Sequence, residues 1–133
     1  MNEAEIRDLL RAAKVIAVVG ISDRPDRDSH RVAAYLQRHG YRIVPVNPAL
    51  KEVLGEVCRA SLRDIPGKVD LVDVFRRPEF VPAIVEDAIA IGAPAIWLQD
   101  GVVHEEAAER ARRAGLAVVM DDCTMRQHLR LRI

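Results

Sequence analysis

The stretch Lys14–Ser22, with the sequence KVIAVVGIS, decides the fold. Five consecutive apolar residues, most of them valine or isoleucine, run straight into Gly20, which is typical of a strand buried on both faces. A polar loop follows over residues 23–29, and residues 30–39 then repeat apolar side chains at helical spacing before Gly40. The pattern predicts a strand, a glycine turn and a helix, the first half of a βαβ unit. The N-terminus of such a helix offers free N–H groups to a phosphate.

The remaining chain repeats this alternation of strands and helices. Further strands are predicted at 42–46, 69–75, 95–98 and 117–120, and further helices after a cap at Asn2, from Glu79 with Pro82 in its first turn, over 104–114 and over 124–131. The strand at 69–75 is less uniformly apolar than the others, so we expect it near an edge of the sheet. Residues 49–62 are ambiguous, and 49–54 are compatible with one helical turn.

Strands that alternate with helices of about ten residues predict parallel strands joined by right-handed crossovers. We therefore expect an α/β fold, Rossmann-like, with three α/β/α layers and a five-stranded, mostly parallel sheet in a single domain over residues 1–133. Ligands of such folds bind at the C-terminal ends of the strands. Each predicted strand is followed by polar or turn residues, so five loops should line one edge of the sheet.

Charge and cysteine content limit the classes of partner and the cellular compartment to be expected. The 20 basic and 20 acidic side chains balance to a formal net charge of zero, which argues against nucleic acid or an anionic membrane surface as the main partner. The chain starts with acidic residues and has no apolar run near the roughly 20 residues of a membrane span. With only two cysteines, we expect a cytoplasmic protein with reduced thiols.

The fingerprint of a nicotinamide dinucleotide site is absent. That site requires G-x-G-x-x-G after the first strand and a carboxylate at the end of the second. Here Gly20 is followed by Ile21 and Ser22, and the second strand ends in Asn47-Pro48.

Arginines occupy the predicted edge instead. Arg24 and Arg27 lie in the first loop, and Arg76 and Arg77 follow the third predicted strand. Guanidinium groups at these positions favour a ligand with several phosphates. Acidic residues surround the first pair, so a solvated charge run stays open as the alternative, and Arg76 is the stronger candidate of the second pair.

Five short motifs carry a resemblance to a known family: VVGIS at 18–22, VPVNP at 44–48, VFRRP at 74–78, IWLQ at 96–99 and the closing Cys123…His128. In this order they resemble the small CoA-binding proteins, stand-alone relatives of the N-terminal domain of the succinyl-CoA synthetase α subunit. The resemblance implies that the phosphates of CoA lie over the first loop and helix. It implies too that the nucleotide and pantetheine pass the loops after the second and third strands toward Gln99.

Together with the residues argued above, the resemblance gives a set of candidate ligand contacts: Gly20, Ile21, Ser22, Arg24, Arg27, Asn47, Pro48, Phe75, Arg76 and Gln99. The chain departs from the family pattern at two positions. Gln127 stands where a glutamate usually precedes the closing histidine, and Asp100 adds a negative charge beside Gln99. The second departure leaves the surroundings of the CoA thiol open.

Several residues invite a second interpretation. Cys123 and His128 are a conceivable nucleophile–base pair, and a cysteine at a helix N-terminus is expected to have a lowered pKa. No third, orienting residue is evident, so we expect structural roles, and the remaining histidines show no metal-ligand spacing. Trp97 is expected in the core, and Asp73, inside an apolar strand, needs a partner if it is buried.

We therefore expect a module that binds coenzyme A or an acyl-CoA, with no catalysis evident from the sequence. Two alternatives stay open: an NAD(P)-linked or thiol-dependent enzyme that uses the same site, and a regulatory protein that senses CoA. A homodimer or a protein partner is left open as well.

Overall fold

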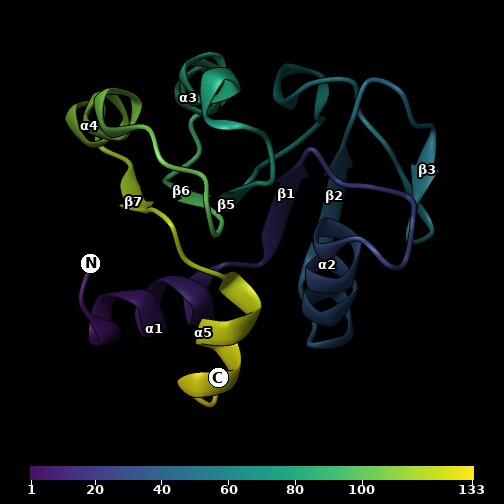
Figure 1. The fold of residues 1–133 in the computed structure, drawn as a ribbon, viewed down its shortest axis with the longest axis horizontal. Helices are drawn as coiled ribbons and strands as arrows, with labels where there is room; N and C mark the ends of the chain where they lie inside the picture. The colour runs from purple at the N-terminus through teal and green to yellow at the C-terminus, as the bar shows by residue number, and fades with distance from the viewer.

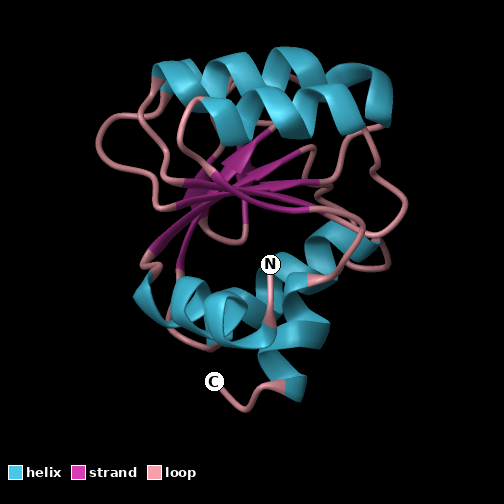
Figure 2. Ribbon diagram, turned by 90° about the vertical axis from the view of Figure 1, so that its left-hand side faces the viewer, coloured by secondary structure: helices cyan, strands magenta, loops and turns pink.

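The computed structural model describes all 133 residues. Its sheet has five parallel strands in the order β2-β1-β5-β6-β7: β1 Val15–Val19, β2 Arg42–Val46, β5 Leu71–Val74, β6 Ala95–Leu98 and β7 Ala117–Val119. The helices are α1 Glu3–Ala12, α2 Asp28–Arg38, α3 Val81–Ala90, α4 Glu105–Arg113 and α5 Thr124–Arg130. Helices cover both faces of the sheet (Figure 2), which confirms the expected three-layer, Rossmann-like fold.

Each face of the sheet carries its own hydrophobic cluster. Ala17 and Val19 of β1 pack into the cluster on the side of α3 and α4. Ile16 and Val18 pack into the cluster on the side of α1, α2 and α5. Alternate residues of β1 thus face opposite layers, which explains the uninterrupted apolar run of its sequence. Figure 1 shows β1 between the layer of α3 and α4 and the layer of α1, α2 and α5.

The expectation that the third strand of the sheet lies near an edge was wrong. β5 is the middle strand, paired with β1 on one side and β6 on the other. Its polar residue, Asp73, is fully buried and is held by hydrogen bonds from Gln99 and Thr124. The polar position marks an internal hydrogen-bond network and not exposure to solvent.

The helical turn considered for residues 49–54 was wrong too. Glu52–Val53 (β3) and Glu56–Val57 (β4) form a small antiparallel hairpin beside β2. Leu54 and Gly55 at its tip both have positive φ angles, 56° and 76°, which is the requirement of a two-residue type I′ hairpin turn. Short 3₁₀ turns follow at Leu62–Asp64 and Pro78–Phe80.

Several local predictions are confirmed. Asn2 Oδ1 accepts a hydrogen bond from the Glu5 N–H, and the Glu5 carboxylate accepts one from the Asn2 N–H, which is a capping box. Pro82 lies in the first turn of α3, and Trp97 is fully buried with its indole N–H donating to the Asp122 carbonyl at 3.0 Å. None of the helices combines the length and the apolar composition that crossing a membrane would need.

Candidate functional site

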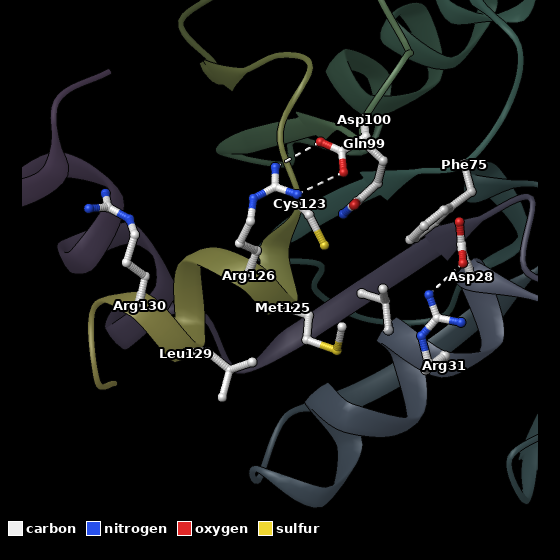
Figure 3. Close-up of a pocket in the computed structure, with 11 residues that line it drawn as sticks. Asp28, Arg31, Phe75, Gln99, Asp100, Cys123, Met125, Arg126, Leu129 and Arg130 are labelled. Atoms are coloured by element: carbon white, nitrogen blue, oxygen red, sulfur yellow. Dashed lines mark hydrogen bonds and ion pairs between the residues drawn. The ribbon is translucent and has the colours of Figure 1, made fainter.

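The strand order reverses between β1 and β5, and the residues that follow these two strands line two adjoining cavities. The main cavity, about 720 Å³, is lined by side chains of α2, α5 and the loops after β5, β6 and β7: Asp28, Arg31, Val32, Phe75, Gln99, Asp100, Cys123, Met125, Arg126, Leu129 and Arg130 (Figure 3). The loop cavity, about 420 Å³, lies over the loop after β1: Gly20, Ser22, Asp26, Arg27, Asp28, Ser29 and Phe75. Such a reversal point is where open α/β sheets bind ligands.

Gly20 lets the loop after β1 approach the end of β5. Its φ of +84° is a left-handed conformation, and a Cβ built there would lie 2.8 Å from Arg76 Cδ and 2.9 Å from the Phe75 carbonyl oxygen. The Gly20 N–H also donates to the Val46 carbonyl at 2.9 Å. Only glycine fits between the two strand ends without displacing the backbone.

The loop after β1 is tied to the first turn of α2. Ser29 Oγ accepts a hydrogen bond from the Ser22 N–H at 3.0 Å, and Ser22 Oγ accepts one from the Arg24 N–H at 3.0 Å. The residue at the N-cap of α2, Arg27, makes no side-chain cap. The first N–H groups of an 11-residue helix therefore remain without a capping side chain beside the loop cavity.

The four arginines predicted from the sequence separate in the structure. Arg27 lines the loop cavity, whereas Arg24 lines neither cavity and pairs with Asp26 at 3.3 Å. The guanidinium of Arg76 lies 4.0 Å from the centre of the Phe80 ring, and Arg77 pairs with Glu79 at 3.4 Å. Arg31, Arg126 and Arg130, which the sequence analysis did not single out, line the main cavity instead.

Asn47, Ile21 and Pro48 line neither cavity. Asn47 Nδ2 donates to the Ile21 carbonyl at 2.9 Å, and Asn47 Oδ1 accepts from the Ala49 N–H at 2.9 Å. Ile21 is fully buried. The structure thus gives Asn47 and Ile21 a part in shaping the loops rather than in lining the cavities.

Gln99 lines the main cavity and closes a buried network. Its Nε2 donates to Asp73 Oδ1 at 2.5 Å and to Thr124 Oγ1 at 2.9 Å, and the Thr124 hydroxyl donates to Asp73 Oδ2 at 3.1 Å. Burial raises the pKa of Asp73 to about 7, against the lowering effect of its two hydrogen bonds. The network supplies the partner that Asp73 was expected to need.

The negative charge of Asp100 is paired. Arg126 donates to both oxygens of Asp100, at 2.9 and 2.8 Å, and also to Asp122 at 2.8 Å (Figure 3). The hydrogen bond from Arg126 holds the pKa of Asp100 below its usual value. Gln127, the other departure from the family pattern, donates to Asp122 at 2.8 Å. Both departures therefore belong to contacts that hold α5 against the sheet edge.

Cys123 and His128 face different surroundings. The thiol of Cys123 lines the main cavity, while His128 Nδ1 is hydrogen-bonded to the Tyr35 hydroxyl at 2.7 Å. Burial raises the pKa of Cys123, so the lowered value expected at a helix N-terminus was wrong. Burial lowers the pKa of His128. No hydrogen bond joins the two side chains, and they do not form a nucleophile–base pair.

The closing helix, α5, contributes several lining residues that were not predicted from the sequence: Met125, Arg126, Leu129 and Arg130. Met125 and Leu129 lie four residues apart on one face of α5, and 59% of Leu129 is exposed to solvent. The sequence did contain a signal for this part of the site: an apolar pair at helical spacing beside Arg126 and Arg130. An apolar helix face of this kind needs an apolar neighbour or ligand to cover it.

The fold and this site define an α/β protein whose ligand-sized cavities lie at the reversal point of a parallel sheet. Residues 14–128 match the model of the CoA binding domain, and the chain belongs to that family. The family resemblance seen in the sequence is thereby confirmed.

The similar proteins are of two kinds: proteins that this chain matches over most of their length, and ligases that it matches over only a small part. The uncharacterized protein YneT of Bacillus subtilis is 46% identical over 96% of this chain and 94% of its own. A hypothetical protein from Pyrococcus horikoshii has a similar structure, with a TM-score of 0.97, 43% identity, and coverage of 100% of this chain and 94% of its own. The ADP-forming acetate–CoA ligase I of Archaeoglobus fulgidus is 28% identical over 83% of this chain, which spans only 18% of the ligase.

Proposed function

We propose that this protein binds coenzyme A or an acyl-CoA, with the phosphates at the loop cavity and the pantetheine arm in the main cavity. The observation that carries the proposal is the adjacency of these two cavities, which share Asp28 and Phe75. A polar cavity that adjoins a larger, more apolar one matches a ligand that has phosphates at one end and a flexible arm at the other.

The loop cavity has the chemistry of a phosphate site. Gly20 brings the backbone of the loop close to the bound group, α2 directs uncapped N–H groups toward it, and Arg27 adds a positive charge. Backbone N–H groups at a helix N-terminus and a guanidinium are a recurrent combination for phosphate binding. Of the sequence-predicted contacts, Gly20, Ser22, Arg27, Phe75 and Gln99 are retained as direct contacts in this proposal.

The main cavity suits a less polar arm. Val32, Phe75, Met125 and Leu129 supply apolar surface, and Gln99 supplies a polar group at a buried position. Apolar walls with a few fixed polar groups are typical of cofactor sites.

Mass spectrometry under native conditions tests the proposal without assuming the ligand. We expect the purified protein, incubated with equal concentrations of CoA, acetyl-CoA and NAD, to retain CoA or acetyl-CoA in preference to NAD. Retention of NAD alone, or equal weak retention of all three ligands, would overturn it.

A further inference from the structure

Gln99, Asp73 and Thr124 form a closed set of hydrogen bonds beneath the main cavity. Asp73 and Thr124 are fully buried and Gln99 is 4% exposed. Both hydrogens of the Gln99 amide are used, one by Asp73 Oδ1 and one by Thr124 Oγ1. The Thr124 proton goes to the other oxygen of Asp73.

The carbonyl oxygen of the Gln99 side chain, Oε1, has no partner within the protein, although every fully enclosed side-chain nitrogen or oxygen has one. Oε1 therefore retains contact with open space. The space that Gln99 lines is the main cavity, and its side chain reaches into it between Cys123 and Phe75 (Figure 3).

The network allows only one orientation of the amide while Asp73 is ionised. A carboxylate accepts hydrogen bonds and donates none, and the Thr124 hydroxyl has already given its proton to Asp73. If the amide turned over, Oε1 would face two acceptors, and buried polar atoms without partners are costly.

We propose that Asp73 and Thr124 are positioning residues that hold Gln99 so that Oε1 accepts a hydrogen bond from an N–H or S–H donor of the ligand. The inference rests on the proposed function, in which the donor belongs to the pantetheine arm: one of its amide groups or its thiol. The site therefore favours a ligand with a hydrogen-bond donor beside Gln99 Oε1. A thioester sulfur carries no proton and cannot donate a hydrogen bond to this oxygen.

Protonation of Asp73 reverses this selection, because a protonated Asp73 can donate to Oε1 and leave the NH₂ group toward the cavity. The register partners of Asp73 on the neighbouring strands are apolar, Val18 on β1 and Trp97 on β6, and only Thr124 reaches it from α5. The ionisable groups that line the main cavity come from three places: Asp28 and Arg31 from α2, Asp100 from the loop after β6, and Cys123, Arg126 and Arg130 from the start and the length of α5. The raised pKa of Asp73, about 7, places the change near neutral pH.

The decisive comparison is Thr124→Val with Thr124→Ser. Serine keeps the hydroxyl and valine keeps the shape, so calorimetry one pH unit above the Asp73 transition should show CoA binding about tenfold weaker for Thr124→Val. Thr124→Ser should stay within about threefold of wild type, well under the 1.4 kcal/mol that a tenfold change represents. Equal losses for both variants would overturn the positioning role.

The ligand donor is identified with desulfo-CoA, which keeps the pantetheine amides and lacks the thiol. If the thiol is the donor, desulfo-CoA and acetyl-CoA bind wild type more weakly than CoA does, and Thr124→Val removes the difference. If an amide is the donor, Thr124→Val weakens the binding of all three ligands equally. One result would contradict the inference and leave the proposed function intact. In that result wild type binds CoA tightly, and neither Thr124→Val nor Gln99→Met changes the affinity for any of the ligands.

The orientation of the amide is also testable without CoA. Nuclear magnetic resonance of the ligand-free protein should show the Gln99 side-chain NH₂ signals, assigned by their loss in Gln99→Met, shifting with a midpoint near pH 7 in wild type. The transition should be absent in Asp73→Asn. A pH-independent Gln99 signal, or a transition that survives in Asp73→Asn, would overturn the proposal whatever the ligand proves to be.

Discussion

Asn47 fastens the loop after β2 to the loop after β1, because its Nδ2 donates a 2.9 Å hydrogen bond to the carbonyl of Ile21. The sequence predicts Asn47 as a ligand contact, at the position where dinucleotide sites carry a carboxylate. In the structure both polar atoms of its side chain are bound to backbone groups. Its effect on ligand binding is expected to pass through the shape of the loop.

Asn47→Asp tests this role. Aspartate keeps the acceptor for the Ala49 N–H but replaces the donor by an oxygen that faces the Ile21 carbonyl. We expect a loss of about 1–3 kcal/mol in the free energy of unfolding, the cost of leaving a partly buried group unpaired. In calorimetric titrations, CoA and dephospho-CoA should lose affinity equally. A distinctly larger loss for CoA would mean that its ribose phosphate lies against residue 47.

Gly20→Ala should destabilise the protein more than Gly40→Ala. Both glycines have positive φ angles, +84° and +95°, but only Gly20 has neighbours where a Cβ would be placed. Forcing a methyl group into occupied space typically costs about 1–3 kcal/mol, so urea unfolding should separate the two variants by that amount. Equal stabilities would show that the ends of β1 and β5 can move apart freely.

Arg27→Ala should weaken CoA binding by about 1.5–3 kcal/mol, the range for a hydrogen bond to a charged group. The matched control is Arg110→Ala, because Arg110 lies on α4, pairs with Glu86 and lines neither of the two proposed cavities. Calorimetry at two salt concentrations should show a loss for Arg27→Ala that shrinks as salt rises. Equal losses for both variants would mean that the arginines act only as a diffuse positive field.

Asp73 gives the unfolding free energy a defined pH dependence. Its pKa is raised from 3.8 in the unfolded chain to about 7 in the folded protein. The contribution of Asp73 to the free energy of unfolding is therefore fully present below the unfolded-state pKa, and it is lost as the pH rises from there through the folded-state pKa. Urea unfolding at pH values between the unfolded-state and folded-state pKa of Asp73 should show wild type losing stability relative to Asp73→Asn as the pH rises. His128, whose lowered pKa acts in the opposite direction, is common to both proteins and cancels in the difference. A difference that is constant with pH would contradict the buried, titrating state of Asp73.

The sequence predicted those features that depend on local pattern. The apolar run of β1 indicated a strand buried on both faces, and Asn2 with Glu5 indicated the capping box. The edge position predicted for β5 failed because Asp73 is satisfied by Gln99 and Thr124, 26 and 51 residues away along the chain. Contacts at that separation leave no trace in the periodicity of a strand.

The site was predicted less completely than the fold. Gly20, Ser22, Arg27, Phe75 and Gln99 were placed at the cavities because parallel strands bring their C-terminal ends to one edge. The contribution of α5 was missed, since only the folded chain shows that Met125 and Leu129 face α2 across the main cavity. The pKa of Cys123 was predicted with the wrong sign because its burial outweighs the effect of the helix N-terminus.

Calorimetric titration of the purified protein with CoA tests whether CoA occupies the two adjoining cavities. We expect one CoA per chain, and we expect Arg27→Ala at the loop cavity and Thr124→Val in the network beneath the main cavity each to weaken binding. NAD, titrated in the same way, should bind far more weakly. Tight binding of NAD with no detectable binding of CoA, or CoA binding that neither variant changes, would contradict the account.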